Sequence, residues 1–318
     1  MLSSDHTSVI MHLLDVLSIL ALAVSTEAVK WSETKHVLAF GDSYTFVAGT
    51  MGHTNFSFFG DRLNLTVTPG QVQTSEIIYN RTSSDGANWI EIITGCYRGR
   101  PSECPRALWN FAFAGAAIDP AIITPHTEWV VPLTGQVGQW LQARKEKLIE
   151  APGNDSLAAF FIGINDTSDV KGWTNITDWM AFWNREMDSY FRTVEQVYDT
   201  GIRSFLFLNV PTRDRSPGSL GRPDVGNQIA QVKNFNILLE QRVNAFKSSR
   251  NDTSVVLFDT NMLMDEALDN ARQFGFTNTT GFCRCSDPGY FWYDSGHITE
   301  RVHRLIANSV LNELEAMV

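Results

Sequence analysis

One stretch decides the predicted fold: Val37-Leu38-Ala39-Phe40-Gly41-Asp42-Ser43-Tyr44. Four consecutive apolar residues that end at a glycine are typical of a short strand buried on both faces of a sheet. Because Gly41-Asp42-Ser43 follows, a serine hydroxyl is expected at the carboxyl end of this strand. Open α/β proteins bind their ligands at this edge of the sheet, so the stretch predicts both a fold and a candidate site.

Further strands and helices alternate along the chain. Apolar runs predict more strands, over 109–114, 157–163, 204–210 and 255–258. Helices are predicted over 87–93, 133–148, 176–198, 224–248, 261–274 and 300–317. Strands that are apolar throughout and alternate with helices indicate a parallel sheet covered on both faces. We therefore expect an α/β fold, a three-layer α/β/α sandwich with a mostly parallel central sheet.

The composition argues against two classes of partner. The 318 residues are 43% hydrophobic, enough to bury a large core, and carry a formal net charge of −10. An acidic chain lacks the electrostatic footprint of a nucleic-acid-binding protein and is not attracted to anionic membranes. No His, Cys or Asp cluster has the spacing of metal ligands, so the sequence implies no metal and no cofactor. We expect a monomer without nucleic-acid partners or stable membrane insertion.

The first residues have a different character. Residues 11–24 are rich in Leu, Ile, Val and Ala and lead into Ser25-Thr26-Glu27-Ala28. This is the pattern of a secretory signal peptide, although no Lys or Arg precedes it and Asp15 interrupts it. We expect a signal peptide over 1–25 that is cleaved between residues 25 and 28, a single domain over 30–318, and secretion to the extracellular space.

Sequons and cysteines agree with secretion. Candidate glycosylation sites, in Asn-x-Ser/Thr sequons, are Asn55, Asn64, Asn80, Asn154, Asn175, Asn251 and Asn278. The cysteines form two local groups, Cys96 with Cys104 and Cys283 with Cys285. A disulfide closes the first loop easily, whereas one in the second group would close a small strained ring. Local pairs are preferred, and the connectivity stays open.

A candidate nucleophile and its partners lie at opposite ends of the chain. A serine nucleophile needs a base beside it, and the base needs a group that orients it. Both can come from the segment Tyr293-Asp294-Ser295-Gly296-His297-Ile298-Thr299. There His297 is the candidate base and Asp294 its orienting group. Each piece alone is a weak signal, because a Gly-Asp-Ser turn or an Asp-x-x-His pair is common.

Donors for a developing negative charge are predicted at the same edge of the sheet. Ser43, Gly115 and Asn165 each follow a predicted strand, and parallel strands bring their carboxyl ends together. Attack on an ester carbonyl leaves charge on its oxygen, which preorganised N–H donors stabilise. The backbone N–H groups of Ser43 and Gly115 and the side-chain amide of Asn165 would form such an oxyanion hole. Asn165 also begins a sequon, and we expect it to carry no glycan because a strand end is buried.

Four blocks in order resemble the GDSL/SGNH hydrolase family: Gly41-Asp42-Ser43, Gly115, Gly163-Ile164-Asn165-Asp166 and Asp294-x-x-His297. They span nearly the whole mature chain. Together with Phe40-Gly41-Asp42-Ser43-Tyr44-Thr45 and Asn110-Phe111-Ala112-Phe113-Ala114-Gly115-Ala116, they resemble fungal secreted acetylesterases of carbohydrate-esterase family 16 and their lysophospholipase-like relatives.

The resemblance implies a flavodoxin-like SGNH-hydrolase fold and a role for each residue. Ser43 would be the nucleophile, His297 the general base and acid, and Asp294 its orienting residue. Gly115 and Asn165 would complete the oxyanion hole with the Ser43 N–H. One residue departs from the pattern, since Ile298 stands where a proline often follows the histidine.

The function that the resemblance implies is a secreted serine esterase. It would remove short acyl groups, chiefly acetyl, from a small-molecule, carbohydrate or oligosaccharide ester. One alternative is a lysophospholipase or lipase of the same fold, and another is a catalytically silent glycan-binding surface protein. Loops 50–84 and 211–223 are mostly polar, which favours short acyl chains. The counter-evidence is a group of aromatic residues that could wall a pocket, Phe56, Phe58 and Phe59.

Several other residues are expected to be structural. Four other histidines have no partner pattern in the sequence, and we expect them to be structural or exposed. They are His36, His53, His126 and His303. Two tryptophans have helical spacing, so we expect Trp179 and Trp183 to face the core rather than stack on a sugar. Asp42 and Asp166 are expected to form turn hydrogen bonds rather than act as acids.

Overall fold

A five-stranded parallel sheet forms the centre of the molecule in the computed structural model, which describes residues 28–60 and 69–316. Its strand order is β2-β1-β3-β4-β5, and all neighbouring pairs run parallel. The strands are β1 (His36–Gly41), β2 (Ala107–Asn110), β3 (Ser156–Phe161), β4 (Ser204–Leu208) and β5 (Ser254–Phe258). Every residue of β2, β3 and β4 is buried, as expected of strands covered on both faces. The predicted α/β fold with a parallel sheet is confirmed.

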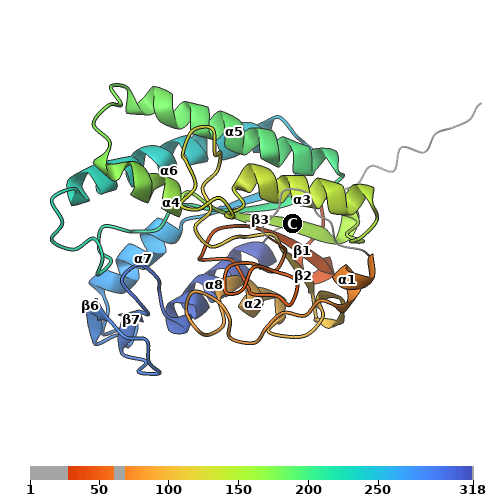
Figure 1. Cartoon of the computed structure of the whole chain (residues 1–318), viewed down its shortest axis with the longest axis horizontal. Coiled ribbons are helices and arrows are strands. Elements are labelled where there is room, and N and C mark those ends of the chain that lie inside the picture. The colour runs from red at the N-terminus through yellow and green to blue at the C-terminus, as the bar shows by residue number, and fades with distance from the viewer. Residues whose placement is uncertain (1–27, 61–68, 317–318) are drawn as a thin grey trace, which may run out of the picture.

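Helices cover both faces of this sheet (Figure 1). On one side lie α3 (Leu133–Lys145), α5 (Trp179–Asp199) and α6 (Val225–Ser248). On the other side, α2 (Trp89–Thr94) packs against α8 (Glu300–Glu315). The other described α-helices are α1 (Pro69–Thr74), α4 (Ile164–Asp169) and α7 (Thr260–Asp269). The predicted three-layer arrangement follows from these two helical layers.

Aromatic rings stack across the central strands and hold the sheet to its helices. The Phe40 ring lies 5.3 Å from the ring of Phe111 and 5.0 Å from that of Phe160. Phe160 in turn lies 5.4 Å from Phe207 on β4. Trp183 is fully buried against Phe235 of α6, and Trp179 is partly buried against the core, which agrees with the orientation that their helical spacing predicted. None of the helices within residues 28–60 and 69–316 is long and apolar enough to cross a membrane.

Two segments near the strand ends differ from the prediction. The strand predicted over 109–114 ends at Asn110, but the N–H groups of Phe111 and Phe113 still donate to β1 carbonyl oxygens. The apolar run therefore continues along β1 without being a regular strand. The segment 164–166, directly after the strand predicted over 157–163, is the first turn of α4, a helix that was not predicted. Helix α7 also ends at Asp269, earlier than predicted.

A small two-stranded sheet near the carboxyl end was not predicted. It pairs β6 (Asn278–Phe282) with β7 (Tyr290–Trp292), and both cysteines of the second group lie in the loop between them. The structure contains two local disulfides, Cys96–Cys104 and Cys283–Cys285. This small sheet leads directly into the segment that carries Asp294 and His297.

Candidate active site

Ser43 lies in a tightly held turn at the end of β1. The side chain of Gln136, from α3, donates to Gly41 O at 2.8 Å and accepts from Gly41 N at 2.9 Å. In the same turn, Asp42 Oδ1 accepts a hydrogen bond from Tyr44 N at 3.0 Å, as expected. Ser43 itself is 8% exposed, so the turn presents its hydroxyl at a partly covered surface.

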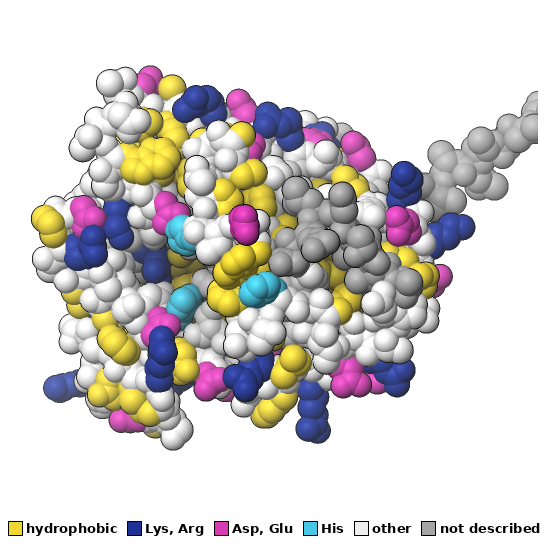
Figure 2. Space-filling model, viewed as in Figure 1, with side chains coloured by type: hydrophobic (Ala, Val, Ile, Leu, Met, Phe, Trp, Pro, Cys, Tyr) yellow, Lys and Arg dark blue, Asp and Glu magenta, His cyan; other side chains and the backbone are white. Residues whose placement is uncertain are grey.

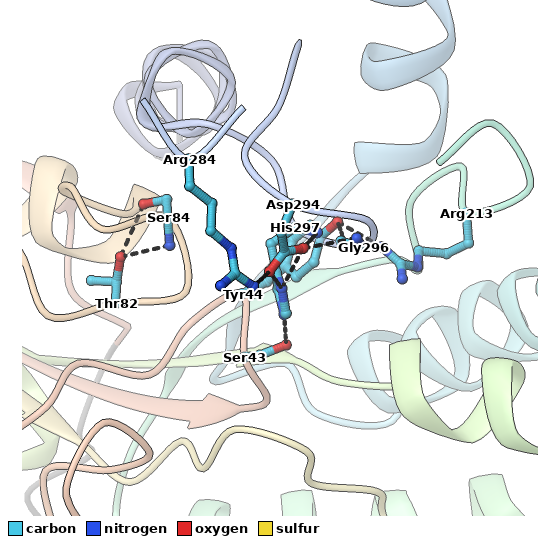
Figure 3. Close-up of polar contacts among 9 residues, drawn as sticks. All are labelled: Ser43, Tyr44, Thr82, Ser84, Arg213, Arg284, Asp294, Gly296 and His297. Atoms are coloured by element: carbon cyan, nitrogen blue, oxygen red, sulfur yellow. Dashed lines mark hydrogen bonds and ion pairs between the residues drawn. The ribbon is translucent and has the colours of Figure 1, made fainter. Parts of the chain in front are cut away.

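His297 faces Ser43 across the edge of the sheet (Figure 3). Its Nε2 is 2.8 Å from Ser43 Oγ, within hydrogen-bond distance. On the other side of the ring, Nδ1 is 3.0 Å from each carboxylate oxygen of Asp294. The arrangement is the one that an activated serine requires, a hydroxyl beside a base that a carboxylate orients.

Backbone hydrogen bonds fix the Asp294 carboxylate. Asp294 Oδ1 accepts from Gly296 N and from His297 N, each at 2.8 Å. Burial acts to raise the pKa of Asp294, but the His297 side chain and these two N–H groups outweigh it and lower that pKa to about 2. The carboxylate is therefore ionised at neutral pH, and it holds the Nδ1–H tautomer that leaves Nε2 free to accept the serine proton.

Two further side chains hold the histidine loop in place. Tyr44 OH donates to Gly296 O at 3.0 Å, and Arg213 Nη1 donates to Tyr44 OH at 2.8 Å. Arg213 Nη1 also donates to Gly296 O. Arg213 thus connects the loop after β4 to the residue that precedes His297, a contact visible in Figure 3. No local sequence pattern could have revealed this role.

Arg284 contacts the same carboxylate from the opposite side. It stands between the two bonded cysteines Cys283 and Cys285, and its Nη2 is 3.6 Å from Asp294 Oδ2. The Arg284 side chain is 68% exposed, so solvent weakens this ion pair. The disulfide loop therefore places a positive charge beside Asp294 without burying it.

The predicted oxyanion donors are available. Within the part of the chain that the structure describes, the backbone N–H groups of Ser43 and Gly115 donate no hydrogen bond. Asn165 Nδ2 donates one hydrogen to Ala116 O at 2.8 Å, and its second hydrogen has no acceptor among those residues. Gly115 has φ of +85°, a conformation that favours glycine.

The start of α4 is tied to the Gly115 segment by two hydrogen bonds. One is the Asn165–Ala116 bond, and in the other Asp166 Oδ1 accepts from Ile118 N at 2.9 Å. The two bonds fix the spacing between the Gly115 N–H and the Asn165 amide. Asn165 is only partly buried, so burial is the wrong reason to expect it to lack a glycan. Its side chain instead lines the pocket with Ser43 and His297, where a glycan would fill the site.

A pocket of about 480 Å³ opens at Ser43 and His297. Its apolar wall comes from Phe56, Ala114, Trp129 and Val130, and Gly115 and Asn165 also line it. Figure 2 shows histidine and hydrophobic side chains gathered around a hollow on this face of the molecule. Of the three phenylalanines considered as a possible wall, only Phe56 lines the pocket, because the other two are buried in the core.

His126 and Trp129 are pocket residues that sequence reasoning missed. The prediction that His126 is merely structural or exposed is incomplete, because its Nε2 is 2.6 Å from Asp169 Oδ2 and it lines the pocket. The ring of His53 stacks on the indole of Trp129, with centroids 4.3 Å apart and planes at 5°.

His303 is buried, and burial together with nearby His297 lowers its pKa to about 3.

The proposed glycosylation sites differ in exposure. Four of the asparagines are exposed, Asn55, Asn154, Asn175 and Asn251, and two are partly buried, Asn80 and Asn278. Asn55 also lines the rim of the pocket. The sequon at Asn64 and the expected signal peptide lie outside the described residues.

Comparison with known proteins finds a family model, curated relatives and solved structures that match this chain. The GDSL-like Lipase/Acylhydrolase family model matches residues 37–310. An acetylesterase of Thermothelomyces thermophilus is 28% identical over 283 residues, covering 87% of this chain and 87% of that protein. GDSL esterase/lipase 3 of Arabidopsis thaliana is 27% identical over 153 residues, covering 37% of this chain and 41% of that protein. A solved structure from Veillonella parvula, a member of the lipolytic protein G-D-S-L family, covers 87% of this chain and 96% of its own, with 15% identity and a TM-score of 0.44.

Proposed function

The chain belongs to the GDSL-like lipase/acylhydrolase family and is a carboxylic ester hydrolase, and we propose that Ser43, His297 and Asp294 perform its reaction on short acyl esters of carbohydrates. Acetyl is the acyl group that we propose. The observation that carries the proposal is the 2.8 Å contact between Ser43 Oγ and His297 Nε2, with Asp294 on the far side of the ring.

Acylation starts at Ser43. As His297 Nε2 takes the hydroxyl proton, Oγ attacks the ester carbonyl carbon and the carbonyl oxygen becomes negative. The N–H groups of Ser43 and Gly115 and the Asn165 amide donate to that oxygen. The carbon–oxygen bond to the alcohol then breaks, His297 returns the proton to the departing alcohol, and the acyl group stays on Ser43.

Deacylation repeats these steps with water as the nucleophile. His297 takes a proton from water, the hydroxide attacks the acyl carbon, and the same donors stabilise the second tetrahedral intermediate. The bond to Ser43 Oγ breaks, and the proton on His297 restores the serine hydroxyl. The carboxylate of Asp294 stabilises the charged imidazole during both halves and does not itself take up the proton.

The pocket supports a short acyl group. Its apolar residues Phe56, Ala114, Trp129 and Val130 share the space with the polar Ser83, Thr127 and Asn165. Each additional methylene is stabilised by about 0.8 kcal/mol only if apolar surface covers it. Among the described residues, a lining of this mixed kind covers an acetyl or propionyl group but does not form the continuous apolar groove that a lipase or lysophospholipase would need.

Carbohydrate as the alcohol part and secretion are supported by separate observations. The acetylesterase relative of similar length matches along 87% of the chain. Trp129 and Phe56 provide aromatic surface beside the serine. Two disulfides and exposed sequons fit an oxidising, extracellular compartment. These observations together favour a secreted acetylesterase, with one catalytic domain over 30–318.

Acetate release tests the proposal. We expect the purified protein to liberate acetate from partially acetylated xylo-oligosaccharides, and the Ser43→Ala variant to liberate none. A preference for lysophosphatidylcholine over both acetylated sugars and p-nitrophenyl acetate would favour the lysophospholipase alternative. Sugar binding by a wild-type protein that hydrolyses none of these esters would favour the catalytically silent one.

A further inference from the structure

A second histidine–carboxylate pair lies beside the proposed catalytic residues. His126 and Asp169 are joined by the 2.6 Å contact between Nε2 and Oδ2, and Asp169 is the last residue of α4. A carboxylate only accepts hydrogen bonds, so Nε2 carries the hydrogen of a neutral His126 imidazole and donates it to Asp169. The other ring nitrogen, Nδ1, then has a free lone pair and is an acceptor.

Gly115 locates this acceptor relative to the proposed oxyanion hole. A methyl group built on Gly115 would lie 3.8 Å from His126 Nδ1. Among residues 28–60 and 69–316, no group donates a hydrogen bond to Nδ1. The His126 side chain is 52% exposed, so a bound substrate can reach it. An open acceptor therefore lies close to where the ester carbonyl would bind.

The neighbouring residues make this part of the pocket suitable for a polyol. Thr127 lines this part of the pocket, although its Oγ1 is itself buried. Next to it, the indole of Trp129 is held by the stacked His53 ring and by Phe56, whose ring centroid is 4.6 Å away. The open acceptor of His126 beside this rigid aromatic surface matches a ligand that offers both a hydroxyl group and an apolar ring face.

We propose that His126, held by Asp169, is a specificity-determining residue that accepts a hydrogen bond from a hydroxyl on the alcohol part of the ester. The inference rests on the proposed function, because Ser43 and His297 perform the hydrolysis that His126 directs. When the alcohol part of the ester has a free hydroxyl near the acyl group, that hydroxyl donates a hydrogen bond to His126 Nδ1 in the complex. A methyl ether at that position cannot donate and leaves Nδ1 covered but unpaired, which is unfavourable.

A matched pair of substrates tests this inference directly. The probes are 2-hydroxyethyl acetate and 2-methoxyethyl acetate, which differ by one O–H, and p-nitrophenyl acetate reports the basal reaction. For the wild-type enzyme we expect kcat/KM to favour the hydroxyl compound by about threefold to tenfold, the range for one partly exposed hydrogen bond. His126→Ala should bring this ratio close to one. His126→Gln, which retains a side-chain acceptor, should keep part of the preference.

A histidine outside the pocket provides the control. His36 begins β1, at the end of the strand away from Ser43, so His36→Ala should leave the ratio unchanged. A wild-type ratio of one, or an unchanged ratio in a folded His126→Ala variant, would overturn the assignment of His126. If the wild-type enzyme hydrolyses p-nitrophenyl acetate in either case, the proposed function survives while this inference fails. A wild-type enzyme inactive on every ester would overturn both.

Discussion

The imidazole of His297 lies 2.8 Å from the hydroxyl of Ser43, although 254 positions separate the two residues in the sequence. Ser43 follows β1, an inner strand of the sheet, whereas His297 stands on the loop just before α8. Hydrogen bonds from Tyr44 and Arg213 to Gly296 join these two parts of the molecule. The distance is thus set by the packing of the whole domain and not by either local segment.

Removing the Asn165 amide should slow the chemical step. Asn165→Ala deletes one of three proposed oxyanion donors, and we expect kcat to fall by about a hundredfold or more with a smaller change in KM. Steady-state kinetics with p-nitrophenyl acetate measures both. Asn312→Ala, a change at an exposed position of α8, is the matched control and should leave kcat unchanged. A loss carried wholly by KM would mean that Asn165 binds the substrate without stabilising the transition state.

The acyl preference follows from the mixed lining of the pocket. For p-nitrophenyl esters of two, four and eight carbons we expect kcat/KM to be highest for acetate and to fall as the chain lengthens. The reason is that methylene groups beyond the first few carbons would meet Ser83, Thr127 or solvent instead of apolar surface. Equal efficiency on octanoate and acetate would contradict the account and favour the lipase alternative.

Gly163 should tolerate no side chain. Its φ is +115°, and a methyl group there would lie 2.4 Å from Phe235 Cζ. We expect Gly163→Ala to lower the free energy of unfolding by about 2–4 kcal/mol, through backbone strain and overpacking. Urea denaturation measures the effect. In the control, Gly138→Ala in α3, no described residue beyond the adjacent helix backbone and chain neighbours lies within 4 Å of the new methyl group, so this change should be neutral or stabilising.

Glu186 should make the protein less stable as the pH rises. It is fully buried on α5, with neither carboxylate oxygen hydrogen-bonded in the described residues. Burial, with nearby Asp166 and Asp119, raises the pKa of Glu186 from 4.5 to about 9. Between these pH values the folded state holds a proton that the unfolded state has released, so stability falls from about pH 4.5 to about pH 9.

Glu186→Gln removes this titration. We expect the variant to lose less stability than the wild type between pH 6 and pH 9, as measured by thermal denaturation at each pH. Glu240→Gln, on the exposed surface of α6, serves as the control and should follow the wild-type curve. Parallel curves for Glu186→Gln and the wild type would show that the Glu186 carboxyl does not titrate in this range.

Sequence reasoning predicted the parts of the fold that depend on local composition. The continuous apolar runs at β1, β3, β4 and β5 indicated the parallel sheet, because such runs are stable only when both faces are covered. Phe111 and Phe113 misled the prediction of where β2 ends, since residues buried beyond a strand look like strand residues. Strand β6 (Asn278–Phe282) was missed because its polar sequence has no strand pattern.

The candidate site was predictable where function imposes a motif and unpredictable elsewhere. Ser43, Asn165 and His297 stand in short characteristic blocks, and the structure brings them to one edge of the sheet. Arg213 and His126 stand in irregular loops, and only the tertiary fold brings them to Gly296 and Asp169. Residues that support or shape a site through contacts between distant parts of the chain form no short sequence motif by which they could be recognised.

Covalent labelling tests the central claim, that Ser43 is the nucleophile, most directly. A p-nitrophenyl phosphonate ester mimics the tetrahedral intermediate and should leave one phosphonyl group on the peptide containing Ser43, with loss of activity in proportion to labelling. Mass spectrometry of the intact protein and of its peptides measures both the number and the position of adducts. We expect a single adduct on Ser43 in the wild type and none in a folded Ser43→Ala variant. Inactivation with the adduct on another residue, or esterase activity retained by Ser43→Ala, would contradict it.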